Sequence, residues 1–224
     1  MIYPFEIHDE SSGFANKHYP DLDTLKKITL VSKKEREEIV RLYFTEGIPF
    51  AFLNNPVLFE KIREWLGKHI QVNPKSITIT GSARIGYTLN PYKTQGKKFS
   101  NSSDLDFIII DEALFNRLEN DFLDFIKILS KSTDAKIAAN NTLLENILEI
   151  ERNIPNGFID HWKIPNRKDL ETTNTIYKQL YHLLERMKVT NDSPQPVKAT
   201  VRIYKDWDSC INRISFNLNS ALKD

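Results

Sequence analysis

The sequence predicts an α+β fold in which a short mixed β-sheet is flanked by helices, and two observations lead to this expectation. Four short β-prone runs lie between long segments with the periodicity of amphipathic helices. Helices come first, and the order after them is strand, strand, helix, strand, helix, strand, helix. That order is typical of α+β proteins, in which helices pack on a small sheet.

The composition narrows the classes of protein to which the chain can belong. With 40% hydrophobic and 27% charged residues, it is an ordinary globular protein rather than a disordered one. Its 31 Lys and Arg residues against 30 Asp and Glu residues, a net charge of +1, argue against a dedicated nucleic-acid coat, although a local basic patch is compatible with them. The single Cys210 excludes an internal disulfide framework and a cysteine-cluster zinc site.

Neither a membrane span nor a secretion signal is expected. The longest apolar run is too short to cross a bilayer. The start of the chain, Met-Ile-Tyr-Pro-Phe-Glu, lacks the basic and then apolar layout of a signal peptide. We therefore expect a cytoplasmic protein with no membrane partner.

The N-terminal region is expected to be an extended arm followed by two helices. Residues 1–27 contain prolines, a glycine and aspartates without hydrophobic periodicity. The side chains expected to anchor this arm are Phe5, Phe14 and Tyr19. A helix is predicted over residues 33–46, because Ser32 and Glu35 have the spacing of a capping box. A second helix, over residues 55–70, begins with an Asn-Pro pair, a cap followed by proline at the first helical position.

Four strands and four more helices are expected in the remainder of the chain. Residues 76–80, Ser-Ile-Thr-Ile-Thr, alternate between polar and apolar side chains and predict a half-buried strand. Three further strands are expected over residues 105–110, 157–164 and 197–204. The helices are expected over residues 111–130, 143–151, 169–188 and 207–222.

One domain is expected to span residues 1–224, because the sequence has no internal repeat and no low-complexity tract. Its parts are an N-terminal arm with helices (1–75), a core that would hold the site (76–165), and C-terminal helices with a strand (166–224). The turn at residues 191–194 is the best candidate hinge, but too few residues follow it to form a second domain.

A glycine-serine turn follows the first predicted strand. The segment Gly81-Ser82-Ala83-Arg84-Ile85-Gly86 leaves the strand and enters a helix, so it would present backbone N–H groups and a hydroxyl to an anion. Gly81 permits close approach of the backbone, and Arg84 would add a guanidinium to the same phosphates. Taken alone, such a turn is more often an ordinary strand end.

A pair of aspartates opens the second predicted strand. Asp104 and Asp106 are two residues apart, so in a strand they project from the same face. Carboxylates about 6–7 Å apart repel each other, and a divalent cation relieves the repulsion. Magnesium is the commonest cation held by carboxylates together with substrate phosphates. The alternative is a solvated Asp-x-Asp at the entrance of a strand.

Together the two motifs resemble the signature of the DNA polymerase β-like nucleotidyltransferase superfamily. Gly-Ser-x-x-x-Gly follows one strand, and Ser103-Asp104-Leu105-Asp106 opens the next. The likeness covers residues 77–164 and implies the nucleotidyltransferase fold with N- and C-terminal helical additions. The interval between Ser82 and Asp104 is longer than the pattern of the family, so residues 88–99 are interpreted as an insertion beside the site, which leaves the acceptor specificity open.

The resemblance also implies roles for the residues of both motifs. Gly81 and Ser82 would hold the β- and γ-phosphates of a nucleoside triphosphate, ATP first among them, with Arg84 as a further phosphate ligand. Asp104 and Asp106 would hold two Mg²⁺ ions, for which Mn²⁺ is a possible substitute.

The family also requires a third carboxylate, on a later strand beside the Asp-x-Asp strand. The best candidate is Asp160, a polar residue that interrupts an otherwise apolar strand, and it would complete the catalytic metal site. The alternative for Asp160 is a cap or a solvent-facing residue. Asp206 and Asp208 are rivals, but they have the placement of the N-terminus of the last helix. His161 alternates away from Asp160, so it is expected to be a surface or structural histidine rather than a catalytic one.

The function that the resemblance implies is metal-dependent transfer of a nucleoside monophosphate to a hydroxyl. The acceptor would be an RNA or tRNA end, a partner protein, a nucleotide or a small molecule. Members of the family serve in bacterial toxin–antitoxin systems and antiphage defence. The alternative is a catalytically silent module on the same fold that senses nucleotides or binds a partner. Outside the motifs, Arg202 and Lys205 flank Tyr204 at a strand end, where they would reach a base or a phosphate.

Overall fold

The computed structural model describes residues 17–28, 32–92, 94–131 and 140–222. Four strands form one mixed sheet: β1 (Ile77–Thr80), β2 (Leu105–Ile110), β3 (Phe158–Asp160) and β4 (Ala199–Tyr204). Their order across the sheet is β1-β2-β4-β3, in which β2 and β4 are parallel and the other two pairs are antiparallel. The predicted α+β class with a short mixed sheet is confirmed.

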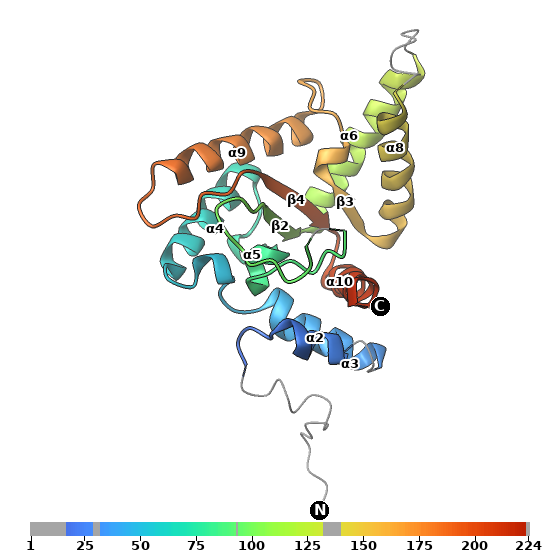
Figure 1. Cartoon of the computed structure of the whole chain (residues 1–224). Helices are drawn as coiled ribbons and strands as arrows, with labels where there is room; N and C mark the ends of the chain where they lie inside the picture. The colour runs from blue at the N-terminus through green and yellow to red at the C-terminus, as the bar shows by residue number, and fades with distance from the viewer. Residues whose placement is uncertain (1–16, 29–31, 93, 132–139, 223–224) are drawn as a thin grey trace, which may run out of the picture.

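Helices surround this sheet (Figure 1). The longer ones are α4 (Pro56–Ile70), α6 (Glu112–Ser130), α8 (Asn141–Asn153), α9 (Glu171–Lys188) and α10 (Trp207–Leu222). The shorter ones are α2 (Leu22–Ile28), α3 (Lys33–Ile39) and α5 (Ser82–Ile85). Each of the five longer helices matches a predicted one to within a few residues. Within the described residues, no helix combines the length and the apolar character needed to cross a membrane.

The predicted arm is wrong at its end, because residues 22–27 belong to helix α2. Asp21 caps this helix by accepting a hydrogen bond from the amide of Thr24, and Leu25 is completely buried. Of the three predicted anchors, Phe5 and Phe14 lie outside the described residues. Tyr19 does hold the chain, because its hydroxyl donates to the carbonyl of Ile48 at 2.8 Å.

The predicted helix caps are present. Ser32 accepts from the amide of Glu35, whose carboxylate accepts from the amide of Ser32, so the capping box is complete. Asn55 accepts from the amide of Leu58 at the start of α4. The helix predicted over residues 33–46 is regular only to the end of α3. It continues as a wider π-helical segment, η1 (Val40–Thr45).

Apolar side chains cover both faces of the sheet. On one face Phe107 and Ile109 of β2 join a core with side chains of α4, α6 and α9. On the other, Ile108 and Ile110 join a core with side chains of α3, η1 and α10. The strand over residues 76–80 was therefore wrongly expected to be half-buried, since even Thr78 is 7% exposed.

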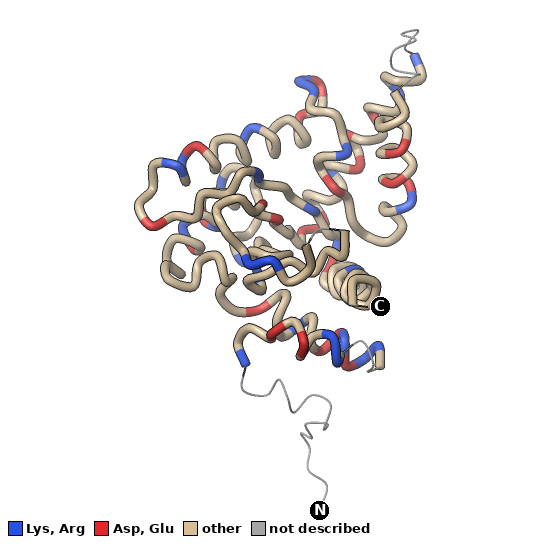
Figure 2. The backbone as a smooth tube through the Cα atoms, in the orientation of Figure 1, with Lys and Arg blue, Asp and Glu red and all other residues tan. Residues whose placement is uncertain are grey.

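Strand β3 is shorter than predicted. It ends at Asp160, and the chain continues into a 3₁₀ turn, η5 (His161–Lys163). Charged residues of both signs are interspersed along the described chain (Figure 2), in keeping with the net charge of +1.

Candidate functional site

The two predicted motifs meet at one end of the β1–β2 pair. These strands are antiparallel, and Thr80 at the end of β1 is opposite Asp106 near the start of β2. Gly81 follows with φ 66° and ψ −152°, a combination that is essentially restricted to glycine. A β-carbon at this position would lie 3.1 Å from Oδ2 of Asp106. The turn is therefore glycine because the backbone passes directly beside a carboxylate.

One helical turn, α5, carries the rest of the first motif. Ser82 is its first residue and is half-buried. Gly86 ends it with φ 92°, and a β-carbon there would lie 2.9 Å from the ring of Phe50. Both glycines of the motif are thus required by the backbone and by the lack of space around them.

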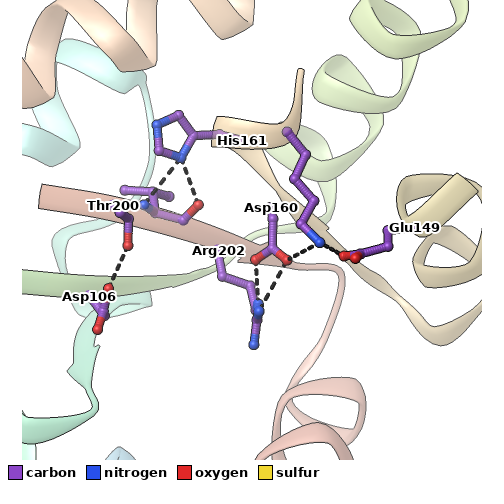
Figure 3. A network of polar contacts seen from close by, with 8 residues as sticks. Asp106, Glu149, Asp160, His161, Thr200 and Arg202 are labelled. Carbon is purple, nitrogen blue, oxygen red and sulfur yellow. Dashed lines mark hydrogen bonds and ion pairs between the residues drawn. The ribbon is translucent and has the colours of Figure 1, made fainter. Parts of the chain in front are cut away.

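The carboxylate of Asp106 is oriented by strand β4. Thr200 lies opposite Asp106 in the parallel β2–β4 register, and its hydroxyl donates to Oδ1 of Asp106 at 2.6 Å (Figure 3). Asp104 directly precedes β2 and is half-buried. Thr200 has no counterpart in the sequence motifs. The only feature of the sequence that could have identified Thr200 is its alternation with Arg202 and Tyr204, which puts all three side chains on one face of β4.

A cavity of about 600 Å³ opens beside this carboxylate. Its floor is the sheet, with Gly81, Asp106, Thr200 and Arg202 among the lining residues. Its walls come from the loop after Gly86, from η5 and from α10, and include Leu89, Asn90, Tyr92, Trp162, Ile214 and Leu218. This volume lies within the range of small-molecule sites. Of the six residues predicted for the site, Gly81 and Asp106 line the cavity.

The segment interpreted as an insertion, residues 88–99, forms one wall of the cavity. A bridge between Tyr87 and Lys98 closes it into a hairpin-like loop. The side-chain Nε2 of Gln95 donates to the carbonyl of Ala221 at 2.9 Å and so connects the loop to the end of α10.

Arg84 takes a different position from the predicted phosphate ligand. It is 3% exposed, and its side chain is not part of the cavity wall. Nε donates to the carbonyl of Tyr43 at 2.7 Å, and Nη1 donates to the carbonyl of Gly47 at 2.8 Å. Burial lowers the pKa of this guanidinium to about 10, so it remains charged at neutral pH. Arg84 therefore supports the turn from behind.

Asp160 is not brought to the aspartate pair. Strand β4 lies between β2 and β3, so two strand spacings of about 4.8 Å each separate Asp160 from Asp106. The carboxylate is 2% exposed and accepts from Nε and Nη2 of Arg202 at 2.6 and 3.0 Å (Figure 3). Lys163 lies 4.0 Å from it. Strand β4, which lies beside β2, carries Thr200 and Arg202 where a third carboxylate was expected.

The rival carboxylates lie at the start of α10, as their sequence position predicted. Asp206 accepts from the amide of Ser209 at 2.7 Å, and this bond holds its pKa below the usual range. Asp208 is in the first turn of α10. Both are exposed and outside the cavity wall.

Of the two alternatives expected for His161, a surface or a structural residue, the structure shows a buried one. The ring is 1% exposed, and Nδ1 lies 2.8 Å from the carbonyl oxygen of Val201. Burial lowers the pKa of His161 to about 4, so the imidazole is neutral at neutral pH.

The carboxylates near the turn are the side chains that could hold a divalent cation. Asp104 and Asp106 are the two acidic residues at the turn, and Mg²⁺ is commonly held by one or two carboxylates together with substrate phosphates. Among the residues that the structure describes, no three His, Cys, Asp or Glu side chains gather as a metal-binding group. Asp104 and Asp106 thus could hold a cation, whereas Asp160 is paired with Arg202.

Comparison of the chain with protein-family models, with curated proteins and with solved structures gave no match.

Proposed function

We propose that this protein is a metal-dependent nucleotidyltransferase that moves a nucleoside monophosphate from a nucleoside triphosphate to a hydroxyl acceptor. ATP is the leading candidate for the triphosphate. The candidate acceptors are an RNA or tRNA end, a protein, a nucleotide and a small molecule. In this proposal Gly81 and Ser82 bind the β- and γ-phosphates. Asp104 and Asp106 hold Mg²⁺, which neutralises phosphate charge when it is bound.

One observation carries the proposal. The backbone at Gly81 lies against the carboxylate of Asp106, and both residues line a cavity large enough for a nucleotide. A metal ion held by a carboxylate can contact the phosphates bound at a turn only if the carboxylate and the turn are neighbours. An ordinary turn beside a solvated aspartate would require neither the glycine-only backbone nor the cavity.

The test is whether Mg²⁺ and Asp106 together determine ATP binding. Asp106→Asn keeps an oxygen that accepts from Thr200, but it removes the charge that would hold the ion. We expect Mg²⁺ to strengthen ATP binding, measured by calorimetry, in the wild type, and we expect this gain to be lost in Asp106→Asn. The metal-free variant should be as stable as the wild type or slightly more stable, because charge repulsion with Asp104 is removed.

A matched control is Asp124→Asn, because Asp124 is an exposed carboxylate on α6 with 61% of its side chain accessible. It should bind MgATP as the wild type does. Transfer is then followed with ATP labelled at the α-phosphate, offered with total RNA and with the protein alone as acceptors. Mg²⁺-dependent binding that is identical in the wild type and Asp106→Asn would rule out this site.

The second candidate is a catalytically silent nucleotide-binding module, and the ion pair of Asp160 favours it. A carboxylate held by Arg202 on the far side of β4 cannot activate an acceptor hydroxyl beside Asp106. The two functions differ in one measurement. MgATP binding without release of pyrophosphate, in a single-turnover assay with every acceptor class, supports the silent module, and release of pyrophosphate supports the transferase.

A further inference from the structure

Arg202 is the charged side chain of the cavity that the proposed function leaves unused. It lines the same cavity as Asp106, from the neighbouring strand. Its side chain is 23% accessible, while the carboxylate that it contacts is 2% accessible. The guanidinium thus has a buried side, turned to Asp160, and a side that faces the cavity.

The guanidinium is held rigidly. Asp160 engages Nε and Nη2, so the N–H groups of Nη1 are not used by this carboxylate. Aromatic rings restrict the group further, because Cζ lies 5.1 Å from the ring centroid of Phe158 and 5.9 Å from that of Trp162. An arginine that is already ordered loses little conformational freedom when it binds a ligand.

The surroundings of Arg202 carry an excess of positive charge. Lys163 and Arg213 are near enough for Arg202 to lower the pKa of both, in each case after the larger effect of burial. Lys163 is paired with Glu149. The cluster therefore has three cations (Lys163, Arg202, Arg213) and two carboxylates (Glu149, Asp160), which leaves one positive charge.

One cation of the cluster also has an unused donor. Nε of Arg213 is buried and makes no hydrogen bond to any residue that the structure describes. Its guanidinium lies over the same Phe158 ring, with Cζ 4.8 Å from the centroid. Like charges that are partly buried together destabilise a protein, and an anion bound beside them reduces their repulsion.

We propose that Arg202 binds a phosphate group of the ligand in this cavity and that Asp160 is the positioning residue that holds its guanidinium. The identity of the ligand as a nucleotide rests on the proposed function, whereas the anion site does not. The cavity then has an acidic end at Asp106 and a cationic end at Arg202. A phosphate-bearing ligand can occupy the cationic end without a metal ion.

The test is binding of sodium tripolyphosphate to the full chain in EDTA, measured by calorimetry. We expect Arg202→Gln to weaken this binding about 10- to 100-fold, the scale of hydrogen bonds to a charged group. Arg202→Lys should lose less, because it keeps the charge without the fork of donors. Asp106→Asn should bind tripolyphosphate more tightly, since it removes a negative charge from the same cavity.

Two further variants separate positioning from charge and control for arginine loss. Asp160→Asn makes the cluster more positive, so a purely electrostatic role predicts tighter binding. The positioning role predicts weaker binding, partly restored in Asp160→Glu. Arg186→Gln is the matched control, because Arg186 also lies over an indole ring (Trp65, 5.2 Å), in a groove between α4 and α9. It should bind as the wild type does.

Each result has one meaning. Equal tripolyphosphate affinity of Arg202→Gln and the wild type would overturn the proposal. So would a result in which Ser82→Ala is the only variant that weakens tripolyphosphate binding. Tighter binding by Asp160→Asn would overturn the positioning role. If Arg202→Gln does not fold, the double variant Asp160→Asn/Arg202→Gln, which removes both members of the ion pair, replaces it with the same expected loss. Arg202-dependent binding without any MgATP binding would refute the proposed function and keep this inference.

Discussion

His161 shows at the scale of one residue how burial fixes a protonation state. The ring is 1% exposed against β4, and burial lowers its pKa from 6.5 to about 4, against a hydrogen bond with Val201 that raises it. The unfolded chain therefore takes up this proton at a higher pH than the folded chain does. The stability that neutral His161 contributes is complete above pH 6.5 and is lost as the pH falls towards 4. Acidification therefore destabilises the folded protein at His161, because this base has a lower pKa in the folded chain than in the unfolded one.

We predict that His161→Asn loses less stability on acidification than the wild type. Between about pH 7 and about pH 4.5, the wild-type free energy of unfolding should fall by roughly 2–3 kcal/mol more than that of the variant, as measured by urea denaturation. Asparagine places a hydrogen-bonding atom close to the position of Nδ1. His182→Asn, at an exposed position on α9, should follow the wild type. Parallel losses in the wild type and His161→Asn would contradict the prediction.

The loop after α5 depends on α10 at the scale of the element. The loop has little regular structure, and its internal bonds include the amide of Thr88 to the carbonyl of Lys97 and the amide of Gly96 to the carbonyl of Thr88. The side-chain Nε2 of Gln95 also donates to the carbonyls of Leu89 and Ala221 at 3.3 and 2.9 Å. One side chain thus joins the loop to the opposite wall of the cavity.

We predict that Gln95→Ala loosens this wall without unfolding the domain. Amide hydrogen exchange of residues 88–97 should accelerate about tenfold or more, because about 1 kcal/mol per hydrogen bond is lost. The matched control is Gln195→Ala, since Gln195 likewise donates to two carbonyls, those of Met187 and Ser193, away from the cavity. It should leave exchange of the loop unchanged. Unchanged exchange in Gln95→Ala would show that other contacts hold the loop.

At the scale of the whole molecule, Arg84 joins the N-terminal helices to the turn of the site. Its guanidinium crosses from α5 to the carbonyls of Tyr43 and Gly47, which belong to η1 and to the segment after it. Tyr43 and Phe44 of η1 are buried in the same core as Ile108 of β2. The additions to the sheet are therefore part of one packed body rather than appendages.

We predict that Arg84→Gln lowers the free energy of unfolding by about 1–3 kcal/mol, because two buried carbonyls lose a charged donor. ATP affinity in Mg²⁺, measured on the folded protein, should stay within about twofold of the wild type. Calorimetry at a temperature well below the unfolding transition checks this. A large loss of affinity with unchanged stability would restore Arg84 as a phosphate ligand.

The sequence alone determined the local structure of this protein, because local structure depends on neighbours along the chain. Periodicity located the five longer helices, and the Ser32–Glu35 and Asn55–Pro56 signals marked their starts. The sequence also located strand β2, from its run of four consecutive apolar residues. The family resemblance linked the glycine-serine turn to the Asp104–Asp106 pair, and the antiparallel register of β1 and β2 places Asp106 opposite the last residue of β1.

Only the tertiary structure decided which strands are neighbours and what each charged side chain faces. Strand β4 comes late in the sequence but lies between β2 and β3, so Arg202 and Thr200 occupy the place expected for Asp160. Arg84 likewise meets carbonyls about forty residues earlier in the chain, a distance at which periodicity carries no information. Strand order and side-chain partners are set by packing of two cores on opposite faces of one sheet, and no local pattern encodes that choice.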